Sequence, residues 1–221
     1  MNLKNYIQLT PSYQKITNLF KKYLIKTDHY AVRTFSPIKI HHELYRYHLQ
    51  PDIYHFPQHH AKARWYLNSY QDIPRVFVSS YQNPFYDQVD PEKVSYLIDY
   101  PHKITFRDYQ KIHDQNPYLA WTLLFHDKIN HVAFEVKDIV EMTKKVSEKF
   151  PLNNPENPIQ ISEDKKILQS SIKADMIDFK FYDKNEKVPF AFVELIERHR
   201  EGFETQNANQ IFKSTDLPPK T

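Results

Sequence analysis

The chain of 221 residues contains no cysteine and only one glycine. Without cysteine it has no disulfide, no thiolate metal site and no thiol nucleophile. Any metal must therefore be bound by histidine or carboxylate side chains. A single glycine excludes the glycine-rich phosphate loops and dinucleotide-binding fingerprints, because each of these needs several residues without a Cβ atom.

Long apolar runs and an excess of one charge are also missing. The first residues, 1–6, lack the apolar core of a signal peptide, and no segment approaches the length of a membrane span. We therefore expect a cytoplasmic protein without a membrane partner. Lys and Arg number 30 against 27 Asp and Glu, and the two signs are interspersed. This pattern disfavours nucleic-acid binding, which needs clustered cations, while the net charge of +3 slightly favours an anionic ligand.

The composition is 40% hydrophobic and 15% aromatic, enough for a core, and we predict a single domain over residues 1–221. The pattern predicts an amphipathic helix and then the strand that carries His29. A helix and two strands follow, and a proline-punctuated middle region reads as a helical insertion. The first helix is predicted over 11–26, and the first module covers 27–125. The predicted elements of this module are strands over 28–35, 63–67 and 75–80 and helices over 37–49, 91–98 and 105–113.

The second module, 126–200, has a clearer pattern, and a C-terminal tail follows over 201–221. The predicted order is one strand, one helix and three further strands, which repeats the architecture of the first module without strong sequence identity. We expect an α+β fold with paired βαβββ modules. The predicted strands cover 128–136, 166–172, 174–182 and 190–197, and the helix covers 138–150.

Two histidines and one carboxylate lie on separate predicted strands: His29, His131 and Glu194. Two imidazoles and a carboxylate on one side of a divalent metal leave open positions, as in non-haem Fe(II) oxygenases. Glu194 lies in a strand that is apolar on both faces, where a carboxylate is costly unless a metal or a cation partners it. The alternatives are ordinary: a lone histidine on a strand is usually a hydrogen-bonded core residue, and Glu194 could pair with an arginine.

Arg33 shares a strand face with His29, because side chains alternate along a strand. Their Cα atoms should lie ~13 Å apart, so a small dicarboxylate could meet a metal at one end and the guanidinium at the other. Arg33 could instead be a structural ion-pair partner. Gln169 is polar within a strand-like segment, which favours contact with a substrate or a metal ligand, although a solvent-facing glutamine explains it almost equally well.

Around these residues the chain resembles the 2-oxoadipate dioxygenase/decarboxylase (2-hydroxyglutarate synthase) family. The matching stretches occur in family order along nearly the whole chain, and their combination is specific although each alone is weak. They lie at residues 28–35, 63–67, 120–133, 168–175, 192–194 and 202–216.

The resemblance implies an iron-dependent enzyme of vicinal-oxygen-chelate-like fold, with a curved mixed sheet around the metal site and helices outside. It implies that His29, His131 and Glu194 bind Fe(II) and that Arg33 binds a substrate carboxylate. The implied reaction, in lysine catabolism, converts 2-oxoadipate and dioxygen to 2-hydroxyglutarate and CO2. This chain is shorter than the enzymes on which that activity is defined, so the exact substrate stays open.

Several alternatives remain at this point. The same fold and metal could support another reaction, or the protein could be a non-catalytic module that binds a small anion. Mn, Co or Zn could occupy the same ligands in a purified sample. The pairs His41-His42 and His59-His60, together with His55 in the loop 55–60, could form a second metal site, although loop histidines are usually just solvated. The sequence does not determine the oligomeric state.

Overall fold

A computed structural model describes residues 10–35, 37–46, 49–51, 63–68, 74–79 and 91–200. The histidine-rich loop 55–60 and the tail 201–221 lie outside the described residues, so the predictions made for them are not addressed. In the described part of the chain, no helix is long and apolar enough to cross a membrane.

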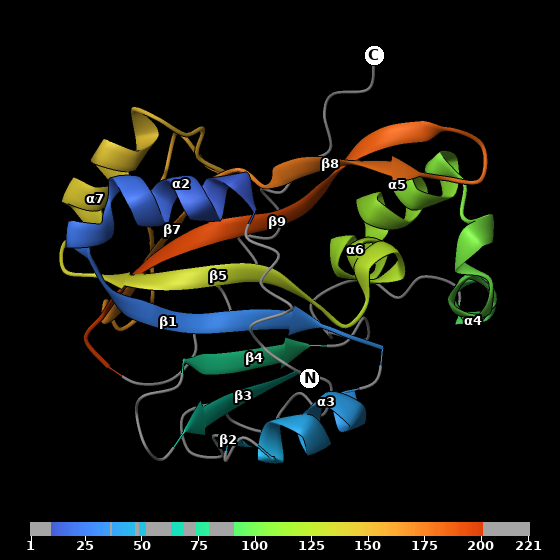
Figure 1. Cartoon of the computed structure of the whole chain (residues 1–221), viewed down its shortest axis with the longest axis horizontal. Helices are drawn as coiled ribbons and strands as arrows, with labels where there is room; N and C mark the ends of the chain where they lie inside the picture. The colour runs from blue at the N-terminus through green and yellow to red at the C-terminus, as the bar shows by residue number, and fades with distance from the viewer. Residues whose placement is uncertain are drawn as a thin grey trace.

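A curved mixed sheet forms the centre of the structure (Figure 1). Its strands run in the order β2-β3-β4-β1-β5-β9-β7-β6, and β8 pairs with β9 outside this path. The strands are β1 Leu24–Arg33, β2 Leu49–Pro51, β3 Ala63–Asn68, β4 Arg75–Ser79, β5 Lys128–Val136, β6 Gln160–Ile161, β7 Ile167–Ser171, β8 Asp175–Lys180 and β9 Asn185–Arg198.

The sheet consists of two modules with the same topology, which confirms the predicted pair of βαβββ units in an α+β fold. In the first module β1 is parallel to β4, and β3 and β2 continue outward in antiparallel order. In the second module β5 is parallel to β9, and β7 and β6 continue outward in the same way. The modules meet where β1 and β5 pair antiparallel. The domain limits predicted from the sequence stay a prediction.

The helices differ from the sequence prediction mainly in their lengths. The first helix ends at Leu19 and a 3-10 turn, η1, leads into β1, whose start at Leu24 lies inside the predicted helix. Another difference is α6, an almost uniformly apolar helix that shows no amphipathic period and was not predicted. The helices are α2 Pro11–Leu19, α3 Pro37–Tyr45, α4 Pro91–Asp99, α5 Phe106–Gln115, α6 Pro117–Phe125 and α7 Ile139–Ser147, with 3-10 turns η1 Lys21–Tyr23 and η2 Pro101–Lys103.

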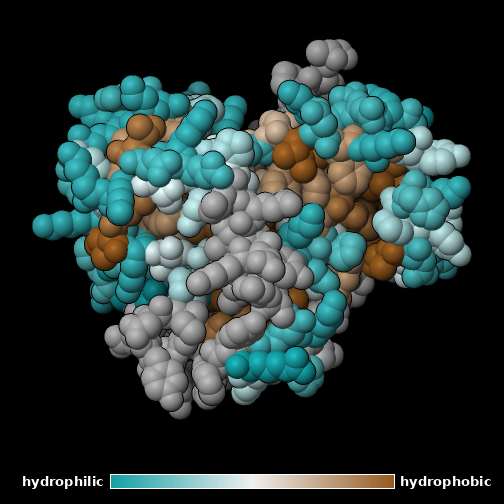
Figure 2. All heavy atoms as spheres, in the orientation of Figure 1, coloured by the Kyte–Doolittle hydropathy of each residue, from teal (hydrophilic) through white to brown (hydrophobic). Residues whose placement is uncertain are grey.

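Two apolar clusters hold the elements together. One lies between the sheet and helices α2, α3 and α7, with Ile16, Leu44 and Val146 fully or nearly fully buried. The other joins α4, α5 and α6 to the hairpin of β8 and β9. On the face seen in Figure 2, apolar side chains gather over β8, α5 and α6, and hydrophilic side chains surround them.

Candidate metal centre

Two of the three register shifts between β1 and β5 flank the centre of the junction between the modules. Between the pairs Thr27–Phe134 and His29–Ala133, strand β1 carries one extra residue, Asp28. Between the pairs Ala31–His131 and Val32–Ile129, strand β5 likewise carries one extra residue, Asn130. A bulge redirects the side chains beside it, and bulges are common next to functional sites.

The two bulges are equivalent. The pair of Tyr30 and Val132 lies at the centre of the junction, and His29 and His131 each precede it by one residue in their own strands. A local two-fold relation therefore superimposes the segment Asp28-His29-Tyr30-Ala31 on Asn130-His131-Val132-Ala133. The similarity of residues 28–31 and 130–133 is present in the sequence. It can be recognised as an equivalence only once the pairing of β1 and β5 is known.

The three predicted metal ligands converge, and all three are buried. The Nε2 atoms of His29 and His131 lie 3.2 Å apart. Oε2 of Glu194 lies 3.3 Å from Nε2 of His131 and 3.9 Å from Nε2 of His29. The point in the plane of these three atoms that is equally far from all of them lies about 2.0 Å from each. This distance matches the usual length of metal–nitrogen and metal–oxygen bonds, roughly 2.0–2.2 Å. These residues therefore fit a divalent metal ion.

The carboxylate of Asp28 supports His29 from the other side of the imidazole. Its Oδ2 lies 2.7 Å from Nδ1 of His29. With the proton on Nδ1, Nε2 of His29 keeps its lone pair free for a metal. Burial raises the pKa of Asp28, but the hydrogen bond from His29 and the charge of Arg198 outweigh it and hold that pKa well below its usual range. Asp28 is therefore an ionised acceptor. The sequence analysis did not assign a role to this residue.

Gln169 supports the third donor. Its Nε2 donates to Oε1 of Glu194 at 2.6 Å, which leaves Oε2 facing the histidines. Gln169 is 3% exposed, so the alternative of a solvent-facing glutamine was wrong. Its predicted contact with a substrate stays a prediction. Within the described residues no lysine or arginine forms an ion pair with Glu194, so no described cation accounts for its burial in that way.

Charge and burial act differently on the donors. Burial lowers the pKa of His131, and the charges of His29 and Arg33 lower it further, so the imidazole stays neutral. Burial raises the pKa of Glu194 above its ordinary value, although the charge of His29 and the hydrogen bond from Gln169 oppose this shift. In the absence of a cation, Glu194 is therefore harder to ionise than an exposed glutamate, and a bound cation would compensate its negative charge.

Arg33 lies at the end of β1, buried between aromatic rings. Its guanidinium carbon lies 4.4 Å from the ring centre of Tyr118 and 5.6 Å from that of Phe77. These rings hold the guanidinium by cation–π attraction. Its effect on the pKa of His131 places its charge within electrostatic reach of the candidate centre. The predicted binding of a substrate carboxylate stays a prediction.

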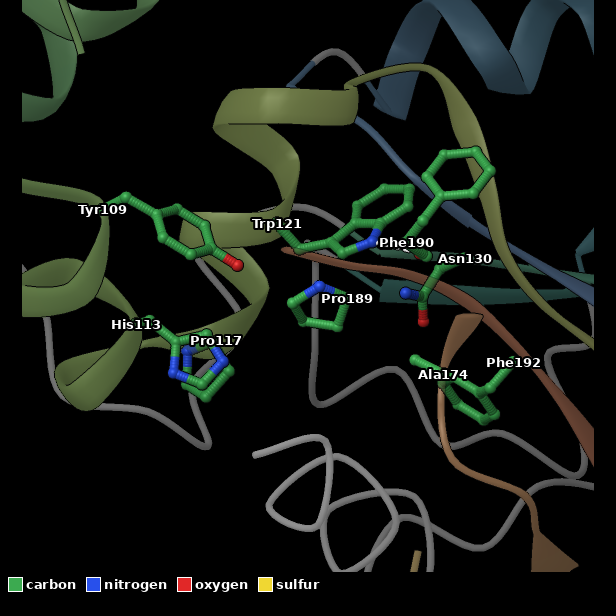
Figure 3. A pocket seen from close by; sticks show the side chains of 9 residues that line it. All are labelled: Tyr109, His113, Pro117, Trp121, Asn130, Ala174, Pro189, Phe190 and Phe192. Carbon is green, nitrogen blue, oxygen red and sulfur yellow. Dashed lines mark hydrogen bonds between the residues drawn. The ribbon is translucent and has the colours of Figure 1, made fainter. Parts of the chain in front are cut away.

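Figure 3 shows a pocket with a mainly apolar lining. Asn130 and Phe192 line it, and both also contact His131: Oδ1 of Asn130 lies 3.3 Å from Nδ1, and the ring of Phe192 stacks on the imidazole. Trp121, from α6, lines the same pocket. The pocket therefore lies beside two of the side chains that contact the second histidine.

The comparisons agree with this geometry. The model of the 2-oxoadipate dioxygenase/decarboxylase family matches residues 92–199. The chain is 25% identical over 279 aligned positions to the chloroplastic/amyloplastic 2-oxoadipate dioxygenase/decarboxylase of Oryza sativa subsp. japonica, covering 96% of this chain and 76% of the relative. It is 30% identical to the chloroplastic enzyme of Arabidopsis thaliana, covering 49% of this chain and 36% of that protein.

This chain is similar to the 2-oxoadipate dioxygenase/decarboxylase family. The resemblance found in the sequence is thereby confirmed. The fold of the family is shared as well: hydroxyglutarate synthase from Oryza sativa, solved in complex with 2-oxoadipate, superposes with a TM-score of 0.74 at 24% identity over 96% of this chain and 88% of that one. A putative hydrolase from Shewanella frigidimarina gives a TM-score of 0.71 at 21% identity, covering 90% of each chain.

Proposed function

We propose that the protein is an Fe(II)-dependent dioxygenase/decarboxylase that converts a small dicarboxylic 2-oxo acid, such as 2-oxoadipate, to a 2-hydroxy acid and CO2. The convergence of His29, His131 and Glu194 carries the proposal, because this donor set is typical of non-haem iron oxygenases. The named relatives are 2-oxoadipate dioxygenases/decarboxylases, which supports an enzyme rather than an anion-binding module.

The residues of this chain divide the work. His29, His131 and Glu194 would hold the ion from one side and leave its other positions open. When bound, Fe(II) supplies the reaction with dioxygen and a chelation point for the 2-oxo acid. Arg33 would bind the distal carboxylate and orient the chain of the substrate. The reaction takes up one O2 and releases one CO2 without an outside reductant, because oxidation of the substrate supplies the electrons.

Oxygen uptake after anaerobic reconstitution with Fe(II) tests the proposal. We expect uptake with dicarboxylic 2-oxo acids from a panel of graded length, and loss of bound metal in His131→Ala and Glu194→Ala. Substituting Mn, Co or Zn for Fe(II) distinguishes the working metal from one that merely fits. A protein that binds 2-oxo acids but consumes no oxygen with any of these metals would be a binding module, contrary to the proposal.

The role of Arg33 is tested separately. We expect Arg33→Ala to retain iron but to lose its preference for substrates with a second carboxylate, because the cation that recognises it is gone. The ratio of kcat/KM for dicarboxylic and monocarboxylic 2-oxo acids measures this. Lys184→Ala is the matched control, since Lys184 also lies over an aromatic ring, 4.3 Å from the centre of Phe106, on the distant hairpin. An unchanged ratio in Arg33→Ala would refute the substrate assignment.

The cytoplasmic location and the place in lysine catabolism stay predictions that accompany this proposal. The names of the two plant relatives place those proteins in plastids. Fractionation of the cells that express this protein would test its own location.

A further inference from the structure

We propose that Asp28 is a positioning residue that makes His29 the more firmly held of the two histidine donors, and that Arg75 and Arg198 fix Asp28 for this task. The inference rests on the proposed function in one respect only, namely that the His29, His131 and Glu194 group binds a metal. It adds that His29 and His131 are held with different firmness, although their positions in the two modules are equivalent.

The contacts of Asp28 come from both modules. Arg75 of β4 donates through Nη1 to Oδ1 at 2.9 Å. Arg198 of β9 donates through Nε to Oδ1 at 3.0 Å and through Nη2 to Oδ2 at 2.9 Å. With His29 on Oδ2, the carboxylate is held by four charge-assisted contacts and is 0% exposed. A carboxylate bound in this way cannot rotate without breaking several strong hydrogen bonds.

The equivalent residue in the second module provides less. Asn130 occupies the same bulge position before His131, but its Oδ1 lies 3.3 Å from Nδ1, against 2.7 Å for the pair of Asp28 and His29. An amide oxygen carries no net charge and makes a weaker acceptor than a carboxylate. At equivalent positions of the two modules, His29 is therefore supported by a charged carboxylate and His131 by a neutral amide.

A carboxylate that accepts the Nδ1 proton orients the imidazole, fixes its tautomer and makes Nε2 a stronger donor to a metal. Removing such a support typically weakens metal affinity about 10- to 100-fold. We therefore expect Asp28→Asn, which copies the arrangement at His131, to weaken metal binding by about this factor. Asn130→Ala should cause a smaller loss, because less support is removed.

The test measures metal affinity by chelator competition in wild type, Asp28→Asn and Asn130→Ala, together with the visible absorption of bound Co(II). We expect a larger loss of metal affinity in Asp28→Asn than in Asn130→Ala, and a changed Co(II) spectrum in Asp28→Asn. Circular dichroism verifies that each variant is folded. Affinity and spectrum equal to those of wild type in a folded Asp28→Asn protein would overturn it. An equal loss in the two variants would overturn it as well, since the histidines would then be supported alike.

Arg75→Gln covers the case in which Asp28→Asn does not fold, because it leaves the bond between Asp28 and His29 in place and loosens only the carboxylate. We expect an intermediate loss of affinity, and unchanged affinity would refute the part assigned to the arginines. Oxygen uptake by wild type distinguishes the two proposals. Metal binding without uptake contradicts the proposed function alone, whereas an active wild type with an unaffected Asp28→Asn contradicts this inference alone.

Discussion

Glu194 combines two opposing demands in one side chain. It is 2% exposed, and burial raises its pKa, so the ionised form that would bind a metal is the form that the folded protein disfavours. Gln169 compensates part of this cost by donating to Oε1. The remaining cost is expected for a site that is stabilised only when a cation arrives.

We predict that Glu194→Gln stabilises the metal-free protein at pH 7.5, because burial raises the pKa of Glu194 and a glutamine has no charge to desolvate, while abolishing metal binding. Because the folded pKa of Glu194 lies above the unfolded one, the folded state retains the proton more strongly. The cost of ionisation therefore appears as the pH rises above the unfolded pKa, and the advantage of the variant should be smaller at pH 5. Urea unfolding at both pH values in the presence of a chelator measures this. Glu186→Gln, on the accessible part of β9, is the control, and an equal advantage at both pH values would contradict the prediction.

At the scale of elements, the parallel strand pairs explain why the centre has one carboxylate and not two. In the second module Ala133 of β5 pairs with Glu194 of β9. The equivalent pair in the first module joins Ala31 of β1 to Phe77 of β4. Phe77 thus occupies the place where a symmetric protein would have a fourth donor, and its ring lies against Arg33. The position equivalent to Glu194 is therefore occupied by an aromatic ring beside a cation.

We predict that Phe77→Glu, which restores the symmetry, binds a divalent metal about tenfold or more tightly than wild type, corresponding to ~1.4 kcal/mol, and loses oxygen uptake. A fourth anionic donor would occupy a position that the reaction needs open. Phe77→Gln has nearly the same shape without the charge and serves as the matched control. If Phe77→Glu bound metal no more tightly than Phe77→Gln, a carboxylate at position 77 would not act as a fourth metal donor, and the prediction would be wrong.

At the scale of the whole molecule, the candidate centre connects the two modules. Its donors come from β1, β5 and β9, and Asp28 is tied to β4 and β9. An ion bound there acts on both halves of the sheet at once. Ligands that bind only the folded state stabilise it by mass action, so occupancy of this site should be visible in the unfolding of the entire protein.

We predict that Fe(II) or Co(II) at 100 times its dissociation constant stabilises the protein by about 2.7 kcal/mol and raises Tm by several degrees. Adding a chelator should reverse the increase. His131→Ala should remove it, while a distant substitution such as Lys184→Ala should preserve it. Differential scanning calorimetry under anaerobic conditions makes the measurement, and an equal rise in His131→Ala would place the bound ion elsewhere.

Much of this architecture was predictable from sequence periodicity. The strand over 128–136 and the helix beginning at Pro91 follow directly from it. The sequence predicts strands over 166–172, 174–182 and 190–197 as the last three of the second module. In the structure the last three strands of this module are β6, β7 and β9, and β8 is the outer arm of a hairpin with β9. The strand β6 was missed because it has only two residues in a proline- and asparagine-rich loop and carries no alternating pattern.

The donors of the candidate centre were also predictable, since a carboxylate in an apolar strand and histidines on separate strands are chemical signals in their own right. The support around them was not. Arg75 and Arg198 are 123 positions apart and meet at Asp28 only because β4, β1, β5 and β9 are adjacent in the sheet. The bulges at Asp28 and Asn130 also depend on strand pairing, which a single strand pattern does not contain.

The junction of β1 and β5 gives this one chain the character of a dimer made from half-chains. If the two halves were identical, an ion on their shared axis would have the same surroundings on both sides, and a ligand could approach in two equivalent ways. The differences between Asp28 and Asn130, and between Phe77 and Glu194, make the two sides of the centre chemically unequal. An unsymmetrical molecule such as a 2-oxo acid can then be received in one orientation only.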